Sequence, residues 1–159
     1  MTEKPGWEKR LTLLAVVLMT ALIWGNSLLP RQQSGAVSED VAELLEPMLQ
    51  VLHMEPSFWH YFVRKAAHFT EFFLLGSLWI LFLRVRHVPF SWFYSLGFSV
   101  ITAWTDEGLQ LLSGRNARIE DVVLDSCGAL AGVLFAALVL YLIRRGGHRI
   151  KQRTEKSDP

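Results

Sequence analysis

The sequence has little of what disulfide-stabilised domains and nucleic-acid-binding proteins depend on. It contains one cysteine, Cys127, which excludes an internal disulfide and any metal site made of cysteines alone. Charged residues are only 19% of the 159 residues, and 16 basic against 15 acidic side chains give a formal net charge of +1. Because no basic stripe exists outside the flanks of the apolar segments, we expect no nucleic-acid partner.

Apolar residues, in contrast, are abundant and come in long runs. Hydrophobic residues make up 51% of the chain and gather in four runs, at residues 11–29, 66–83, 88–105 and 122–143. A helix needs about 20 residues to cross about 30 Å of hydrocarbon. The first run is long for a signal-peptide core and no small-x-small cleavage site follows it, so we interpret it as an uncleaved anchor.

These runs predict an all-α, polytopic membrane protein with a bundle of four transmembrane helices. We place the helices at about residues 11–29, 64–83, 88–112 and 121–143, in a single domain over residues 1–153 that a polar tail, 154–159, follows. The connections between the last three helices are short, which makes those helices antiparallel neighbours.

Basic residues predict the orientation of the bundle. If the four helices alternate in direction, 11 of the 16 Lys and Arg residues lie on the side of the two termini. The positive-inside rule then places both termini in the cytoplasm.

The one long external segment, residues 30–63, predicts an amphipathic helix. Ser38 is a suitable N-cap, Val41 and Leu45 begin an apolar stripe at helical spacing, and Pro47 should kink or divide the helix. We expect this helix to pack over the bundle as a lid or to lie on the outer interface. An aromatic run, residues 58–62, should lie at headgroup level just before the second transmembrane helix.

Ionisable side chains at membrane depth are the most informative feature. On the second helix, Arg64, His68 and Glu71 share one face, with Lys65 at its edge. Two further clusters lie at the end of the third helix and around the start of the fourth. They contain Asp106, Glu107, Gln110, Arg115, Asp121 and Asp125. Because neighbouring helices alternate in direction, we expect all three clusters to meet near the outer leaflet.

These charges must face one another or water. A charged residue at the bilayer centre costs about 2.5 to 3.5 kcal/mol even on insertion-based scales. One interpretation is an ion-pair network that only fastens the outer helix ends. The other is a functional site, which we favour because helices in membranes usually associate through small residues and few polar contacts.

Three segments together resemble the VanZ-like family of bacterial membrane proteins. They are RKAAHFTEF from Arg64, DEGLQLLSGR from Asp106 and DVVLDSCGALAG from Asp121. The resemblance extends over residues 24–132, with a weaker match to a Ser/Gln-rich exit from the first helix at Ser27, Gln32 and Gln33. The matching positions are Arg64, Lys65, His68, Glu71, Phe72, Asp106, Glu107, Gln110, Arg115, Asp121 and Gly128. At Asp125 the chain departs from the family, which usually has Asn there.

The resemblance implies a protein of the bacterial inner, cytoplasmic membrane with a role in the cell envelope. The family's name-giving member is associated with low-level resistance to the glycopeptide teicoplanin, so the resemblance implies a comparable resistance role. An outward-facing site is consistent with this, because glycopeptides and their targets are extracytoplasmic.

Two functions follow from the residue types. In the first, Arg64, Lys65 and Arg115 bind an anionic group of a membrane lipid or cell-wall precursor, for which guanidinium groups are well shaped. In the second, the protein is an enzyme in which His68 is the general base, oriented by Glu71 or Asp106, on a lipid-linked phosphate or acyl substrate. The ligand-binding set is the same ten residues, from Arg64 to Asp125, that form the three clusters. We favour binding, since no nucleophile motif is present.

We expect no cofactor and no metal. His68, Glu71 and the aspartates are proper ligands for a divalent cation, but their spacing is not a strong zinc pattern and arginines lie nearby. A pair of small residues, Gly128 and Gly132, predicts close helix packing within one chain rather than dimerisation, and the oligomeric state is left open.

Overall fold

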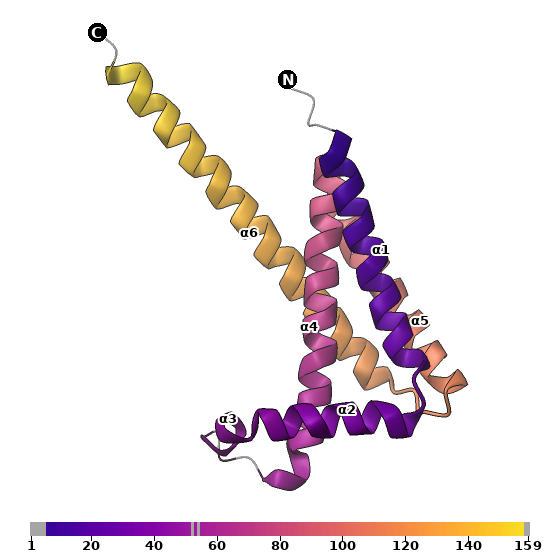
Figure 1. The fold of residues 1–159 in the computed structure, drawn as a ribbon. Coiled ribbons are helices and arrows are strands. Elements are labelled where there is room, and N and C mark those ends of the chain that lie inside the picture. Colours follow the sequence, from indigo (N-terminus) through magenta and orange to yellow (C-terminus); the bar gives the residue numbers. More distant parts are fainter. Residues whose placement is uncertain (1–5, 52, 54, 158–159) are drawn as a thin grey trace.

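The computed structural model describes residues 6–51, 53 and 55–157, and the described residues form helices without any strand. An all-α fold is therefore confirmed. The helices are α1 (Gly6–Leu28), α2 (Arg31–Leu44), α3 (Glu46–Val51), α4 (Pro56–Val85), α5 (Ser91–Leu112) and α6 (Ile119–Ser157). In Figure 1, α1, α4 and α5 run side by side, α6 crosses α4 obliquely, and α2 lies across one end of the bundle.

Three of the described helical segments are long and apolar enough to cross a membrane: Gly6–Leu28, Phe58–Val85 and Ile119–Gly146. The fourth predicted span, α5, is not among them. Its inner face carries Ser91, Ser95 and Ser99, each 4% exposed or less, and its end carries Asp106 and Glu107. These polar residues lower its hydropathy, although α5 lies along α1, α4 and α6.

Several predicted boundaries differ from the structure. Helix α4 begins at Pro56, so the aromatic run 58–62 lies inside it rather than before it. Helix α6 continues through Ser157, and residues 154–157 extend this helix. Ser38 lies within α2, which begins directly after Pro30, so its predicted capping role is wrong. The segment is divided into two helices, α2 and α3, as predicted, but the break is at Leu45 and Pro47 lies in the first turn of α3.

Helix α4 is the centre of the bundle and packs most closely on α6. A Cβ atom added at Gly128 would meet the backbone of Phe69, and one at Gly132 would overlap the carbonyl group of Phe73. Gly76 on α4 stands equally close to the backbone of Ala129. These glycines let the two helix backbones approach within the chain, as the sequence predicted.

The core lies where α1, α4, α5 and α6 meet. Its fully buried side chains include Ile23, Phe72, Leu75 and Ala103. A separate small cluster of Ala42, Leu49 and Val63 holds α2 and α3 against α4. Burial of these apolar groups fixes α2 across the end at which the ionisable clusters lie.

Candidate functional site

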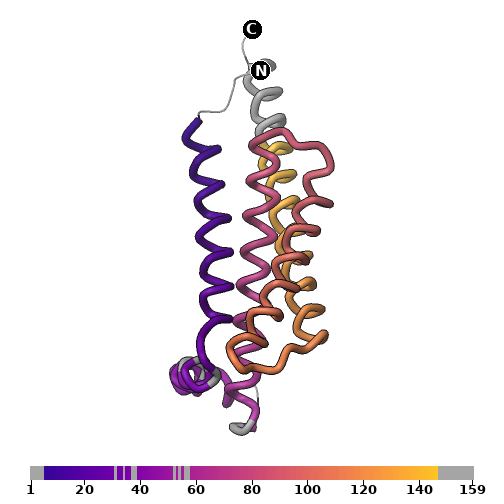
Figure 2. The backbone as a smooth tube through the Cα atoms, turned by 90° about the vertical axis from the view of Figure 1, so that its right-hand side faces the viewer, coloured from indigo at the N-terminus to yellow at the C-terminus, as the bar shows by residue number. Residues whose placement is uncertain are grey.

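The ionisable clusters come together at the end of the bundle beside α2. This end contains the last turn of α1, the first half of α4, the last turns of α5 and the first turns of α6 (Figures 1 and 2). The antiparallel course of α4, α5 and α6 brings residues far apart in the chain to this end. Nine of the ten predicted site residues lie in these segments, Arg115 lies in the link between α5 and α6, and each of the ten is buried or half-buried.

Asp106 is fully buried and forms the best-satisfied part of the site. Ser27 Oγ donates a hydrogen bond to Asp106 Oδ1 over 2.5 Å, and Gln110 Nε2 donates to Asp106 Oδ2 over 2.9 Å. Ser113 Oγ also donates to the carbonyl oxygen of Ser27 over 2.9 Å. These bonds fix the end of α5 to the end of α1.

Other carboxylates have partners from neighbouring elements. Lys65 on α4 forms an ion pair with Asp121 on α6. Asn26 Nδ2 donates a 2.8 Å hydrogen bond to Glu71 Oε1. The backbone N–H of Arg118 donates to Glu107 Oε2 over 2.8 Å, which leaves Glu107 Oε1 buried without a hydrogen bond.

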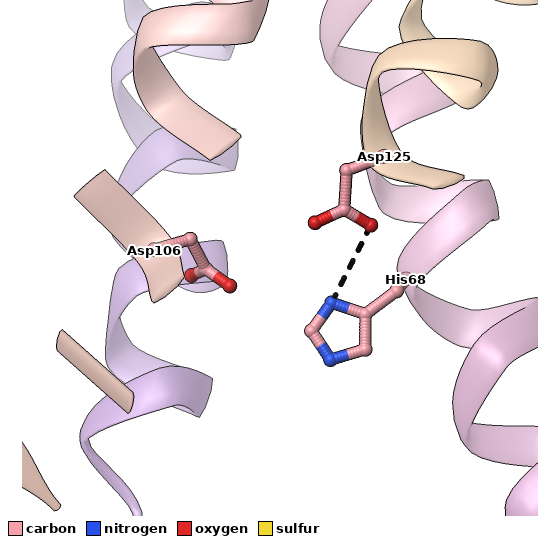
Figure 3. Close-up of side chains that lie close together, drawn as sticks. All are labelled: His68, Asp106 and Asp125. Carbon is pink, nitrogen blue, oxygen red and sulfur yellow. Dashed lines mark ion pairs between the residues drawn. The ribbon is translucent and has the colours of Figure 1, made fainter. Parts of the chain in front are cut away.

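His68 lies beside Asp125, and this pair is only loosely joined. Asp125 is fully buried, and His68 Nδ1 is 3.8 Å from Asp125 Oδ1 (Figure 3). That distance exceeds the 2.7–3.2 Å of an N–H···O hydrogen bond. Neither His68 Nδ1 nor either Asp125 oxygen has a hydrogen-bond partner among the described residues. Together with Asp106, they offer three ligand atoms that all lie within 4.8 Å of one another.

A cavity of about 190 Å³ opens beside the network, and we call it the basic cavity. Its lining residues are Tyr61, Arg64, Lys65, Arg115, Asn116, Arg118 and Asp121. Lys65 also lies over the ring of Tyr61, 5.4 Å from its centroid. Four cations against one carboxylate make this cavity suited to an anion.

A second cavity of similar volume, which we call the apolar cavity, shares Arg64 and Arg115 with the first. Its lining adds polar groups from α1 and α4, including His68 and Glu71, and a larger apolar area that includes Leu29, Val41 and Val63. The two arginines therefore stand between a charged space and a largely apolar one.

Of the described basic residues that line these cavities, Arg115 alone is buried. It is 5% exposed, and its Nε and Nη2 atoms have no hydrogen-bond partner among the described residues. Burial, and then the neighbouring Arg64, lower the pKa of Arg115 from its usual value. Arginine is nevertheless charged in proteins, so this guanidinium is a buried cation with unused donors.

Sequence reasoning did not include several residues in the site. Asn26 and Ser113 hydrogen-bond to the network, and Tyr61 and Asn116 line the basic cavity. For Asn26 a signal exists, because it and Ser27 are consecutive polar residues at the end of an apolar run. The 3.8 Å contact between Asp125 Oδ1 and His68 Nδ1 was also not assigned from the sequence.

The family model for VanZ/LLP1 matches residues 12–141. The chain belongs to the VanZ/LLP1 family. This match confirms the resemblance on which the sequence interpretation relied and extends it to most of α1 and α6. Comparison with curated proteins and with solved structures gives no match. With three apolar helices of spanning length, the chain is a membrane protein of the VanZ/LLP1 family.

Proposed function

We propose that this VanZ/LLP1 protein binds the phosphate group of an anionic envelope lipid or lipid-linked cell-wall precursor in the basic cavity. The observation that carries the proposal is Arg115, a buried guanidinium with two unpaired nitrogen atoms between two cavities. A buried charge is costly unless it is paired. A phosphate oxygen accepts hydrogen bonds from a guanidinium fork in good geometry, which would relieve that cost.

The two cavities together favour an amphiphile over a free anion. The basic cavity would hold the headgroup, and the apolar cavity, lined by Leu29, Val41 and Val63, would hold the first carbons of the attached chain. Each cavity, at about 190 Å³, is smaller than the roughly 300–1,000 Å³ of pockets that enclose drug-sized ligands. This size supports recognition of a headgroup rather than of a whole glycopeptide.

The proposal includes four membrane crossings with the site on the outer side. Helix α5 would be the fourth crossing, with its serines turned inward and bonded to the carbonyl groups one turn earlier. Exposed apolar side chains such as Leu18, Phe93 and Leu134, each more than half exposed, would face lipid. Basic residues at the opposite end of the bundle support cytoplasmic termini.

Binding of lysophosphatidic acid tests the proposal. We expect the full chain, purified in neutral detergent, to bind this lipid, and Arg115→Gln to weaken binding by about 10- to 100-fold, the effect of about 1.5–3 kcal/mol for a charged hydrogen bond. Arg144→Gln is the matched control, because Arg144 is an exposed arginine at the other end of α6. Equal affinities of the two variants would refute the proposal.

Labelling tests the orientation. In a Cys127→Ala background, a cysteine placed at the exposed Glu43 of α2 should react with a membrane-impermeant maleimide in intact cells, whereas one at Arg144 should react only after lysis. The reverse pattern would overturn the outward position of the site.

A role in glycopeptide resistance is a further part of the proposal. Family membership supports it. A protein that binds the headgroup of a cell-wall precursor would act on the same side of the membrane as glycopeptides. We expect expression of the protein to raise the teicoplanin concentration that stops growth of a susceptible strain. Arg115→Gln, expressed at the same level, should remove that increase.

An enzyme is the second candidate, and the contact between His68 and Asp125 favours it. A histidine next to a buried carboxylate can take a proton from a water molecule that attacks a phosphate ester. Replacement of His68 by Ala distinguishes the two functions. An enzyme would lose turnover while it keeps lipid affinity, whereas a binding protein would lose only a moderate part of its affinity.

A further inference from the structure

Beside the apolar cavity, which His68 lines, is a group of three side chains that the anion proposal does not use as a unit. His68 comes from α4, Asp106 from α5 and Asp125 from α6, and Figure 3 shows them turned toward one another. Both aspartates are fully buried. The geometry points to a binding site for a divalent transition-metal cation, held by His68, Asp106 and Asp125.

Asp125 is the strongest argument for a cation. Both its oxygens are buried without a hydrogen bond, and it is directed into the group. The charge of Asp125 is repelled by three nearby carboxylates, at Glu71, Asp106 and Glu107. Among the described cations, Lys65 is near enough to attract it. Lys65, however, already pairs with Asp121. A buried carboxylate in this position needs a cation, and buried charges in proteins are paired or coordinate metals.

The distances fit coordination better than hydrogen bonding. Two ligand atoms of a tetrahedral zinc site, each about 2.1 Å from the metal, lie about 3.4 Å apart. His68 Nδ1 and Asp125 Oδ1 are 3.8 Å apart, and the third ligand atom, on Asp106, completes a set within 4.8 Å. Closing the longest of these distances to about 3.4 Å would take a combined side-chain shift of up to about 1.4 Å.

The surroundings of Asp106 resemble the support that metal-binding carboxylates usually have. Ser27 and Gln110 each donate a hydrogen bond to it and fix its orientation. Such neighbours orient ligands and increase metal affinity. Three protein ligands leave a fourth position for water or for a ligand atom, and His68 lines the apolar cavity from which that atom would approach.

The charge balance also agrees with a dication, despite the nearby arginines. The buried or half-buried side chains of the three clusters include five carboxylates, at Glu71, Asp106, Glu107, Asp121 and Asp125. They include three cations, at Arg64, Lys65 and Arg115. The exposed Arg118, which lines the basic cavity, adds a fourth positive charge, so the set has one or two excess negative charges that a divalent ion would offset. Imidazole and carboxylate together suit Zn²⁺, Co²⁺ or Mn²⁺.

Metal titration without lipid tests this site separately from the anion proposal. The full chain in neutral detergent, treated with a chelator, should bind one Zn²⁺ per chain, and Co²⁺ should give the visible absorption of a site with nitrogen and oxygen ligands. His68→Gln and Asp125→Asn should each weaken Zn²⁺ binding by about 100-fold or more, and Ser27→Ala by about 10-fold, the effect typical of a ligand's hydrogen-bond partner.

Glu120→Gln is the matched control, because it removes an exposed carboxylate from the same helix. It should bind Zn²⁺ like the natural sequence. The proposal would be overturned if the natural protein bound neither Zn²⁺ nor Co²⁺. It would also be overturned if Asp125→Asn and Glu120→Gln bound Zn²⁺ with the same affinity. The first of these outcomes is measured on the natural protein alone, so the test does not depend on whether any variant folds.

Discussion

Replacement of Gly132 by alanine should separate α6 from α4 and thereby disturb the site. A Cβ atom at this position would overlap the carbonyl oxygen of Phe73 and lie 2.8 Å from the carbonyl carbon, where ordinary contacts begin at 3.4 Å. The obstructing atoms are backbone, so a rotamer change cannot relieve the clash. The helices must therefore move apart by at least about half an ångström, a distance that packed interiors accommodate only at a cost.

The cost can be approximated from two opposing effects. Alanine in place of glycine favours a helix by about 1 kcal/mol, whereas overpacking costs about 1–3 kcal/mol and more where backbone must shift. Gly97 on α5 is the matched control, because a Cβ atom there would meet nothing within 4 Å. Gly97→Ala should thus be neutral or stabilising, and Gly132→Ala should be destabilising by about 1–3 kcal/mol relative to it.

Thermal unfolding in detergent measures this difference. At about 2–4 °C per kcal/mol for a chain of this size, Gly132→Ala should unfold several degrees below Gly97→Ala. Gly132→Ala should also bind lysophosphatidic acid more weakly, because α6 carries Asp121 and Asp125 toward α4. If both variants shift the unfolding temperature equally and in the same direction, the close contact between α4 and α6 does not exist as described.

Three further predictions concern single contacts. Ser27→Ala should destabilise the fold by about 1–3 kcal/mol, because a buried oxygen of Asp106 loses its donor, and thermal unfolding measures this; an unchanged unfolding temperature would contradict it. Lys65→Gln and Asp121→Asn should couple by about 0.5–3 kcal/mol in a double-mutant cycle, and strict additivity would show that the ion pair contributes nothing. Arg86→Gln should destabilise the fold by about 1 kcal/mol, because the guanidinium of Arg86 donates a hydrogen bond to a backbone carbonyl of α1. It should leave the affinity for lysophosphatidic acid unchanged, and a loss of that affinity would contradict this prediction.

Much of the fold could be predicted from the sequence, because the hydrophobic effect leaves long apolar runs in the helices. Long uncharged runs predicted helices at the positions of α1, α4, α5 and α6, and the alternation of direction predicted which ends meet. The start of α4 could not be predicted well, because the aromatic run 58–62 suits both a headgroup-level segment and a helix turn. The prediction of Ser38 as an N-cap was wrong for a similar reason. A serine before an apolar stripe is a good N-cap only if the preceding residues are not already helical.

Membership of the site was easier to predict than its pairings. The spacing of Arg64, His68 and Glu71 fixes one face of a helix, but not how far that helix is rotated toward each neighbour. As a result, the contact between His68 and Asp125 could not be predicted from the spacing. Glu71 accepts a hydrogen bond from Asn26. Such partners depend on side-chain packing between helices, which no periodicity in one helix encodes.

The affinity of the natural protein for lysophosphatidic acid, compared with its affinity for the uncharged monoacylglycerol of the same chain length, tests the central claim most directly. The two lipids differ only in the phosphate group, which the buried guanidinium of Arg115 should hold. We predict at least about tenfold tighter binding of the phosphate-bearing lipid, as expected for one hydrogen bond to a charged group. Equal affinities would contradict the account.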